Sequence, residues 1–239
     1  MQRYFANKIN DNIILNEDDI FHITKVMRSN KNDLFEIVCN EELYLAKITN
    51  LKPFSFEIVE KTNENNELTG YIRLLYCLPK GEKLDLVIQK AVEIGASEIV
   101  LVNSSRCVRK ITKEEFKKKK DRFNKIIKEA SEQCKRTKLM KLSDVIEYKE
   151  INKYEADKQF ICYEKCGDNA SNFKDQLLDI KNKTINVLVG SEGGFSEEEV
   201  EYAISNGFKS VSLGKRILRS ETSCIYVLSI LAFFMELEK

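Results

Sequence analysis

Histidine is almost absent from this chain of 239 residues, because His22 is the only one. A Ser-His-Asp triad needs a histidine as its general base, and most catalytic zinc sites use histidine ligands. Seven cysteines, an odd number, are scattered along the chain without a Cys-x-x-Cys pair. We therefore expect no metal site, and we interpret the cysteines as reduced, buried thiols typical of a cytoplasmic protein.

The Gly-x-Gly-x-x-Gly pattern of dinucleotide-binding folds is also missing. The amino terminus has no apolar segment of the kind found in secretory signals. The longest apolar run, Cys224 to Met235, is too short to span a bilayer and is interpreted as a buried helix. These absences favour a cytoplasmic globular protein and argue against a nicotinamide-dependent oxidoreductase.

Charge is distributed unevenly, although the net charge is only +1. Between Arg106 and Lys141 the sequence has 15 basic and 5 acidic residues, so this segment carries +10 and the remainder about −9. A basic stripe on an otherwise acidic protein is the pattern expected for RNA binding. A lysine-rich helix that merely faces solvent is the alternative for the stripe taken alone.

Two domains are predicted, because the pattern of apolar residues changes near residue 70. Residues 1–70 contain short alternating segments that are typical of a small β-barrel. A short helix from Asp18 to Arg28, with Asn16 as its cap, interrupts them. The polar segment Asn63 to Thr69 would form the linker. The strands expected in this domain are Leu34–Val38, Leu43–Ile48 and Ser55–Val59.

From Tyr71 onward, apolar runs alternate with helical patterns, which predicts a parallel sheet covered by helices on both faces. The fold class of this domain, residues 71–239, is therefore α/β. The expected strands are Ile72–Leu78, Ile99–Val102, Gln159–Tyr163, Asn186–Gly190 and Ser210–Leu213. The expected helices are Lys83–Ile94, Glu114–Thr137, Glu197–Ser205 and Glu221–Glu236.

Two glycine-containing loops stand out in this second domain. The apolar run Val187–Val189 breaks into Gly190–Gly194, and Leu213–Leu218 repeats the arrangement before the last helix. Glycine lets the backbone approach a ligand at unusual dihedral angles. Loops at the carboxyl ends of neighbouring parallel strands meet at one edge of a sheet, so the sequence predicts a ligand site there.

The helix after the first loop narrows the chemistry of that ligand. Ser196 and Glu199 have the spacing of a capping box, and Glu197 and Glu198 lie in the same first turn. These carboxylates already complement the positive end of the helix dipole, so a phosphate would be repelled. A neutral or cationic ligand fits better, and a sulfonium cofactor is one candidate.

With these features the sequence resembles the RsmE-type methyltransferases of the SPOUT trefoil-knot superfamily over essentially its whole length. The resemblance implies methylation of ring nitrogen 3 of a uridine in 16S ribosomal RNA, with S-adenosylmethionine as cofactor. It also implies a PUA-like β-barrel RNA-binding domain at 1–70, a SPOUT domain with a carboxyl-terminal trefoil knot at 71–239, and a homodimer. The motifs that carry it, besides the two loops, are Arg3–Phe5, His22–Arg28, Lys90–Ala96, Ser104–Val108 and Glu132–Arg136.

The chain departs from the family pattern at a few positions. The family usually has proline where Ser191 stands, small residues where Cys134 and Lys135 stand, and glycine where Asn32 stands. Asparagine adopts the left-handed conformation almost as readily as glycine, so the change at Asn32 is mild.

The enzyme interpretation gives roles to individual residues. Arg216 or Arg219 is expected to orient the uracil or its phosphate through a planar guanidinium, and Arg219 is the catalytic candidate of the two. Glu221 is expected to accept the proton of the ring nitrogen. The alternative for Glu221 is a simple partner of the helix dipole. The expected RNA contacts are Arg3, Arg28, Arg106 and Arg136. The expected cofactor-binding residues are Tyr163, Gly190, Ser191, Glu192, Gly193, Gly194, Leu213, Gly214, Arg216, Ile217 and Leu218.

The competing interpretation is a non-catalytic protein that binds RNA or assists ribosome assembly. In that case the glycine loops are only turns between strands and helices. Binding of S-adenosylhomocysteine separates the two interpretations.

Overall fold

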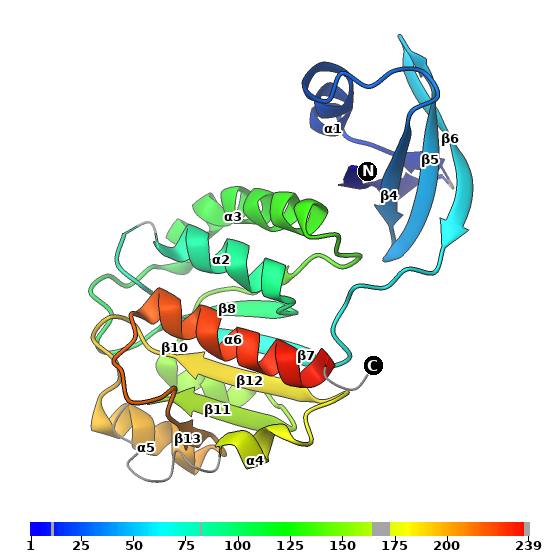
Figure 1. Ribbon diagram of the computed structural model, residues 1–239. Coiled ribbons are helices and arrows are strands. Elements are labelled where there is room, and N and C mark those ends of the chain that lie inside the picture. Colours follow the sequence, from blue (N-terminus) through cyan, green and yellow to red (C-terminus); the bar gives the residue numbers. More distant parts are fainter. Residues whose placement is uncertain (11, 82, 164–172, 237–239) are drawn as a thin grey trace. The chain divides into compact units, whose positions relative to one another are not determined.

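The structure, a computed structural model, describes residues 1–10, 12–81, 83–163 and 173–236 (Figure 1). It divides into two compact units. The first contains Met1–Glu67 together with Lys128–Leu139, and the second contains Leu68–Ile127 and Met140–Lys239. The sequence did not indicate that the segment 128–139 would belong with the amino-terminal residues.

A four-stranded sheet forms the centre of the first unit, in the order β1-β4-β5-β6. Strands β4, β5 and β6 are antiparallel, whereas the short β1 pairs with β4 in parallel. Tyr4, Ile23, Phe35 and Ile48 lie in the core of this unit. The bounds of its strands are β1 Arg3–Phe5, β2 Asn7–Ile9, β3 Asn12–Ile14, β4 Leu34–Cys39, β5 Glu42–Leu51 and β6 Phe54–Thr62.

The helix of the first unit begins as expected but changes character within two turns. Asn16 caps it, because its side-chain oxygen accepts a hydrogen bond from Asp19 N at 2.7 Å. Helix α1 spans Glu17–Phe21 and continues as the π-helix η1, His22–Val26. Arg28 then adopts a φ of +52°, and Asn32 a φ of +75°. The left-handed conformation expected for Asn32 is therefore confirmed.

The second unit is built on a parallel sheet in the order β10-β8-β7-β12-β11-β13, with β9 also pairing with β8. All its strand pairs are parallel, and every residue of β8 is buried. Such strands are typical of sheets that are covered on both faces. The bounds are β7 Tyr71–Cys77, β8 Glu98–Asn103, β9 Lys141–Leu142, β10 Ile146–Glu147, β11 Lys158–Cys162, β12 Thr184–Val189 and β13 Lys209–Val211.

Helices cover both faces of this sheet. Leu75, Val100 and Leu188 share one core cluster with Val200 of α5 and Ile151 of the 3-10 helix η2. The α2 and α6 helices lie side by side, and α6 packs against strands β7 and β12 (Figure 1). The expected α/β class is confirmed. The helical bounds are α2 Lys83–Ile94, α3 Lys113–Gln133, η2 Tyr148–Lys153, α4 Phe173–Leu177, α5 Glu197–Ser205 and α6 Ser220–Glu236.

Helix α3 ends earlier than the expected Thr137, because Lys135 adopts a φ of +64° that an α-helix does not accommodate. None of the helices in the described part of the chain is both long enough and apolar enough to cross a membrane.

Glu98 is a buried charge at the start of β8, with its side chain 0% exposed. Its carboxylate accepts hydrogen bonds from Arg73 Nε at 2.6 Å and Tyr71 Oη at 3.0 Å, and Lys141 Nζ lies 3.1 Å away. Ser143 donates a further hydrogen bond. Burial raises the pKa of this carboxyl, but the hydrogen bonds from Ser143, Arg73 and Lys141 outweigh it and hold the pKa below its usual value.

We expect the Glu98→Ala variant to be less stable by about 3–5 kcal/mol, because Arg73 loses its partner in a largely buried position. Asp144→Ala is the matched control, since Asp144 pairs with Lys120 at 3.3 Å on the exposed surface. That pair should contribute at most about 1 kcal/mol. Urea unfolding measures the free energy of unfolding of both variants. Equal decreases in Glu98→Ala and Asp144→Ala would contradict the role given to Glu98.

The same carboxylate makes stability depend on pH. Its folded-state pKa lies below the ordinary value of about 4.5, so it stabilises the fold above that pH. This contribution disappears as the pH falls through the folded-state pKa. The free energy of unfolding should therefore fall more steeply below pH about 4.5 in the wild type than in Glu98→Gln.

Candidate functional site

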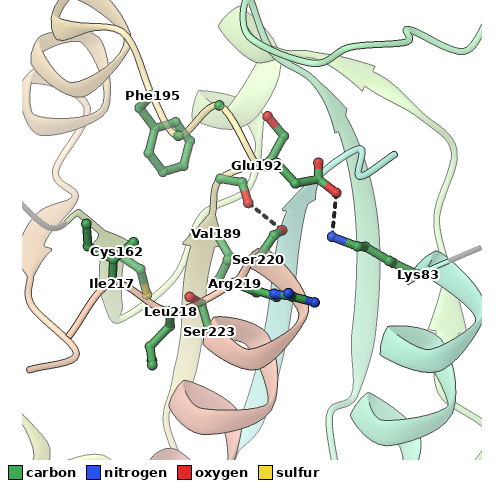
Figure 2. Close-up of a pocket in the computed structure, with 14 residues that line it drawn as sticks. Lys83, Cys162, Val189, Glu192, Phe195, Ile217, Leu218, Arg219, Ser220 and Ser223 are labelled. Atoms are coloured by element: carbon green, nitrogen blue, oxygen red, sulfur yellow. Dashed lines mark hydrogen bonds and ion pairs between the residues drawn. The ribbon is translucent and has the colours of Figure 1, made fainter. Parts of the chain in front are cut away.

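A pocket of about 390 Å³ opens beside the two glycine loops, at the carboxyl ends of β11 and β12. A second pocket of about 60 Å³ shares Cys162, Ile217, Leu218 and Ser223 with it. Figure 2 shows the lining of the larger pocket, to which the start of α2 contributes Lys83. This is the edge at which open α/β sheets bind ligands, and the volume is ordinary for a small-molecule site.

Every residue predicted to bind a cofactor lines one of these pockets. The larger is lined by Gly190–Gly194, Ile217 and Leu218. The smaller is lined by Tyr163, Leu213, Gly214 and Arg216, again with Ile217 and Leu218. The family resemblance also implies a third cofactor loop after strand β11, at Cys162, Tyr163 and Glu164, of which Glu164 lies outside the described residues. The structure thus brings together three segments that are far apart in the sequence.

Packing requires glycine in the first loop. Gly194 has a φ of +65°, and its N–H donates to the carbonyl oxygen of Ser191 at 2.9 Å. A Cβ on Gly190 would lie 3.2 Å from Gly194 Cα, and one on Gly193 would lie 3.0 Å from Arg106 O. The glycines therefore close a tight turn as well as expose backbone to the pocket.

Ser220, at the start of α6, connects the two loops. Its hydroxyl donates to the Gly190 carbonyl oxygen at 2.8 Å and pairs with the Tyr76 hydroxyl at 2.9 Å. Sequence reasoning missed both residues, because a serine at a helix start and a tyrosine within a buried strand are ordinary in those places.

Three charged side chains form a cluster at the edge of the larger pocket. Lys83 Nζ lies 2.9 Å from Glu192 Oε1 and 3.2 Å from Glu221 Oε2. Hydrogen bonds that Lys83 donates to Glu192 and Glu221 raise the pKa of Lys83. Burial raises the pKa of Glu192, but the hydrogen bonds from Lys83 and from the Lys80 N–H outweigh it and hold the pKa below its usual value.

The two catalytic candidates differ in position. Arg219 is exposed and lines the larger pocket. Glu221 lines neither pocket, and its carboxylate is paired with Lys83. Sequence reasoning missed Lys83, which is the first residue of α2 and carries no motif of its own.

The predicted capping box at α5 is confirmed. Ser196 Oγ accepts from Glu199 N at 3.2 Å, and Glu199 Oε2 accepts from Ser196 N at 3.0 Å. The other oxygen of Glu199 accepts from Ser105 N at 2.6 Å. Arg106 Nη1 donates to the Gly193 carbonyl at 3.1 Å, so the loop after β8 is attached directly to the first glycine loop.

The four arginines expected to contact RNA fall into two classes. Arg106 and Arg28 are exposed. Arg3 is fully buried in the first unit, where Nε lies 2.7 Å from Glu36 and Nη2 lies 3.2 Å from Glu64. Arg136 is 4% exposed and lies 2.7 Å from a carboxylate oxygen of Glu67. The structure thus gives Arg3 and Arg136 a structural role, which differs from the expected RNA contact.

The basic stripe lies largely on α3. This helix buries Phe116, Phe123 and Ile127 on one face. Lys118 and Lys119 on its outer face are exposed and form no ion pair with any described residue. Among the residues that the structure describes, no group of three or more His, Cys, Asp or Glu side chains could hold a metal ion.

Comparison with known proteins adds to this geometry. Residues 66–232 match the family described as RNA methyltransferase domain. Ribosomal RNA small subunit methyltransferase E of Bacillus subtilis (strain 168) is 32% identical over 99% of this chain and 98% of its own length. Its namesake from Mesomycoplasma hyopneumoniae (strain 232) is 34% identical over 96% of this chain and 98% of its own length.

A solved structure has a similar fold. It is the ribosomal RNA small subunit methyltransferase E from Neisseria gonorrhoeae bound to S-adenosyl methionine, with a TM-score of 0.83 and 26% identity. The similarity covers 97% of this chain and 96% of that one. The chain belongs to the RNA methyltransferases, in the family of ribosomal RNA small subunit methyltransferase E.

Proposed function

We propose that this protein methylates ring nitrogen 3 of a uridine in 16S ribosomal RNA, with S-adenosylmethionine as the methyl donor. Family membership supports RNA methylation, and the relatives named for the small ribosomal subunit support the choice of RNA. The observation that carries the proposal is the pocket in which both glycine loops expose backbone groups beside a carboxylate, Glu192.

The pocket fits the proposed cofactor. Polar backbone groups of Gly190–Gly194 and Leu213–Leu218 suit an adenosine and an amino acid moiety, and Glu192 suits a positive charge. When bound, S-adenosylmethionine supplies an electrophilic methyl group on its sulfonium. The loops would hold this group in line with the acceptor nitrogen, which contributes much of the rate. The acceptor lies on the pairing edge of uracil, so the base must be unpaired or flipped out.

Arg219 is our candidate for orienting the uracil, since it lines the pocket and its guanidinium is exposed. For Glu221 we propose a supporting role through Lys83 in place of proton acceptance, because it lines neither pocket and its carboxylate is paired with Lys83. Arg28, Arg106 and the exposed lysines of α3 are the proposed RNA contacts.

We further propose a PUA-like RNA-binding β-barrel for residues 1–70 and a SPOUT domain with a carboxyl-terminal trefoil knot for residues 71–239. The antiparallel strands β4 to β6 support the first assignment. The close packing of the α6 start against the Gly190 loop supports the second. The proposed substrate is 16S RNA, either free or within the small subunit. A protein that acts on this substrate works in the cytoplasm.

A homodimer through α6 completes the proposal. One side of α6 packs within the second unit, whereas Tyr226 is 42% exposed and Phe233 is 59% exposed. These side chains and the partly exposed Ile230 lie one turn apart on the other side of the helix. An apolar stripe on both sides of a helix calls for two partner surfaces, and a second copy of α6 supplies the second.

The proposed function is tested by mass mapping of modified uridines in ribosomal RNA from cells with and without the gene. One methylated uridine should disappear without the gene and return with the wild-type copy. Gly194→Val should fail to restore it, because a β-branched side chain is strained at the φ of +65° and displaces the loop. Affinity for S-adenosylhomocysteine should fall at least about tenfold, as measured by isothermal titration.

Gly207→Val is the matched control. Gly207 has a φ of +88°, so the backbone strain is similar, but it lines neither pocket. It should retain cofactor binding. A folded Gly194→Val protein with unchanged affinity would refute the cofactor site, and cofactor-free binding of RNA alone would favour a non-catalytic protein.

The role of α3 in RNA binding is tested by measuring how RNA affinity depends on salt concentration. Replacing Lys118 and Lys119 with glutamine should weaken RNA binding and reduce the slope of log affinity against log salt by about one per lost phosphate contact. The pair Lys149 and Lys153 is the control, because both are exposed but lie outside the stripe. If the two double variants show equal slopes of log affinity against log salt, α3 does not contact RNA phosphates and its lysines only face solvent.

Dimerisation is tested by Phe233→Glu. Because Phe233 is exposed in the single chain, the charge should be tolerated in the monomer and unfavourable in an interface. Sedimentation should show a folded monomer with weakened cofactor binding, since α6 follows the second loop directly. Ile204→Glu, at an exposed position on α5, should remain dimeric. A wild-type protein that is monomeric at micromolar concentration would rule the dimer out.

A further inference from the structure

The carboxylate of Glu192 is held rigidly at the pocket. Its oxygens accept hydrogen bonds from the Lys80 N–H at 3.2 Å, and Oε1 also accepts from Lys83 Nζ at 2.9 Å. Figure 2 shows the side chains of Glu192 and Lys83 meeting at the edge of the pocket. An ionised carboxylate offers about four acceptor positions, so this one retains capacity for a ligand.

The cluster around Glu192 has an excess of negative charge. Lys83 is its single cation, and it is shared between Glu192 and Glu221. The side chains of the two glutamates are 29% and 14% exposed, so solvent screens their charges only in part. Arg219, the remaining charged residue of the lining, is exposed and therefore more strongly screened.

The helix that follows the loop adds to this field. Glu197, Glu198 and Glu199 occupy the first turn of α5. They offset the positive end of the helix dipole, which would otherwise repel a cation at this place. The side of the pocket formed by Glu192 and the start of α5 is therefore suited to a ligand that carries a positive charge, whereas the exposed Arg106 and Arg216 lie beside the two glycine loops.

We propose that Glu192, fixed by Lys83, is the counter-charge by which this pocket prefers the cationic cofactor to its uncharged thioether product. The inference rests on the proposed function. Methyl transfer breaks the sulfur–methyl bond, forms the bond to ring nitrogen 3 and releases the proton of that nitrogen to water. The sulfonium becomes a thioether, so the cofactor loses one positive charge while the pocket keeps its negative charge.

This assignment gives Glu192 a role in turnover as well as in binding. The attraction between Glu192 and the ligand is strongest before transfer and disappears with the sulfonium. The product is therefore held less tightly than the substrate, which favours its release and limits product inhibition. The residues that hold the adenosine moiety cannot provide this distinction, because that moiety is the same in both molecules.

The test compares two ligands by isothermal titration without any reaction. Sinefungin carries an amine in place of the sulfonium and is cationic, whereas S-adenosylhomocysteine is uncharged at that position. An opposite unit charge in a partly screened site supports a preference of roughly tenfold or more for the cation. We expect wild type to show this preference, and Glu192→Gln to reduce it to within about threefold of unity.

Glu192→Gln retains the shape of the side chain, so its affinity for S-adenosylhomocysteine should change little. Glu192→Ala removes the same charge with a different shape and should lose the preference in the same way. Glu150→Gln is the matched control, because it removes a partly exposed carboxylate that pairs with Lys153 outside both pockets. Its preference for sinefungin should equal that of wild type.

The outcomes separate this inference from the proposed function. If neither ligand binds the wild-type protein, the proposed function fails. If both bind wild type equally, or if the preference survives in both Glu192 variants, the role of Glu192 is overturned while the cofactor site stands.

Discussion

The pocket depends on a hydrogen bond from the Ser220 hydroxyl to the carbonyl oxygen of Gly190, at 2.8 Å. This bond joins the end of β12 to the start of α6, so it fixes where the second glycine loop approaches the first. Because Ser220 donates its single proton to Gly190, the Tyr76 hydroxyl at 2.9 Å must be the donor in their contact. Buried polar groups without partners are costly, and each of these three therefore stabilises the other two.

The long elements were predictable because each spans enough residues to repeat its pattern. Helices Lys83–Ile94 and Glu197–Ser205 have the expected bounds. The end of α3 was not predictable in the same way, since it depends on the φ of +64° at Lys135. A glycine in the sequence can indicate a left-handed backbone conformation, but a lysine does not. Elements as short as β9 and β10 show no period at all.

The sequence predicted the parts of the candidate site that are formed by backbone groups, namely the glycine loops. It did not indicate the side chains that reach the site from other elements. Gly193 and Gly194 are recognisable because their spacing is unusual outside a tight loop. Lys83 reaches the site from α2, and only the sheet order shows that it lies near Glu192. The basic side chain of Arg3 suggested RNA contact, whereas the structure buries it and pairs it with the carboxylate of Glu36.

In the second unit, the basic residues proposed to bind RNA and the acidic residues at the pocket lie on different elements. Exposed lysines of α3, among them Lys118 and Lys119, are suited to a polyanion, whereas Glu192 and the start of α5 are suited to a cation. A single positive region serving both tasks would repel the sulfonium. A single negative one would repel the RNA. The net charge of +1 therefore hides an uneven distribution of charge, and it carries no information about either partner until the charges are located on the fold.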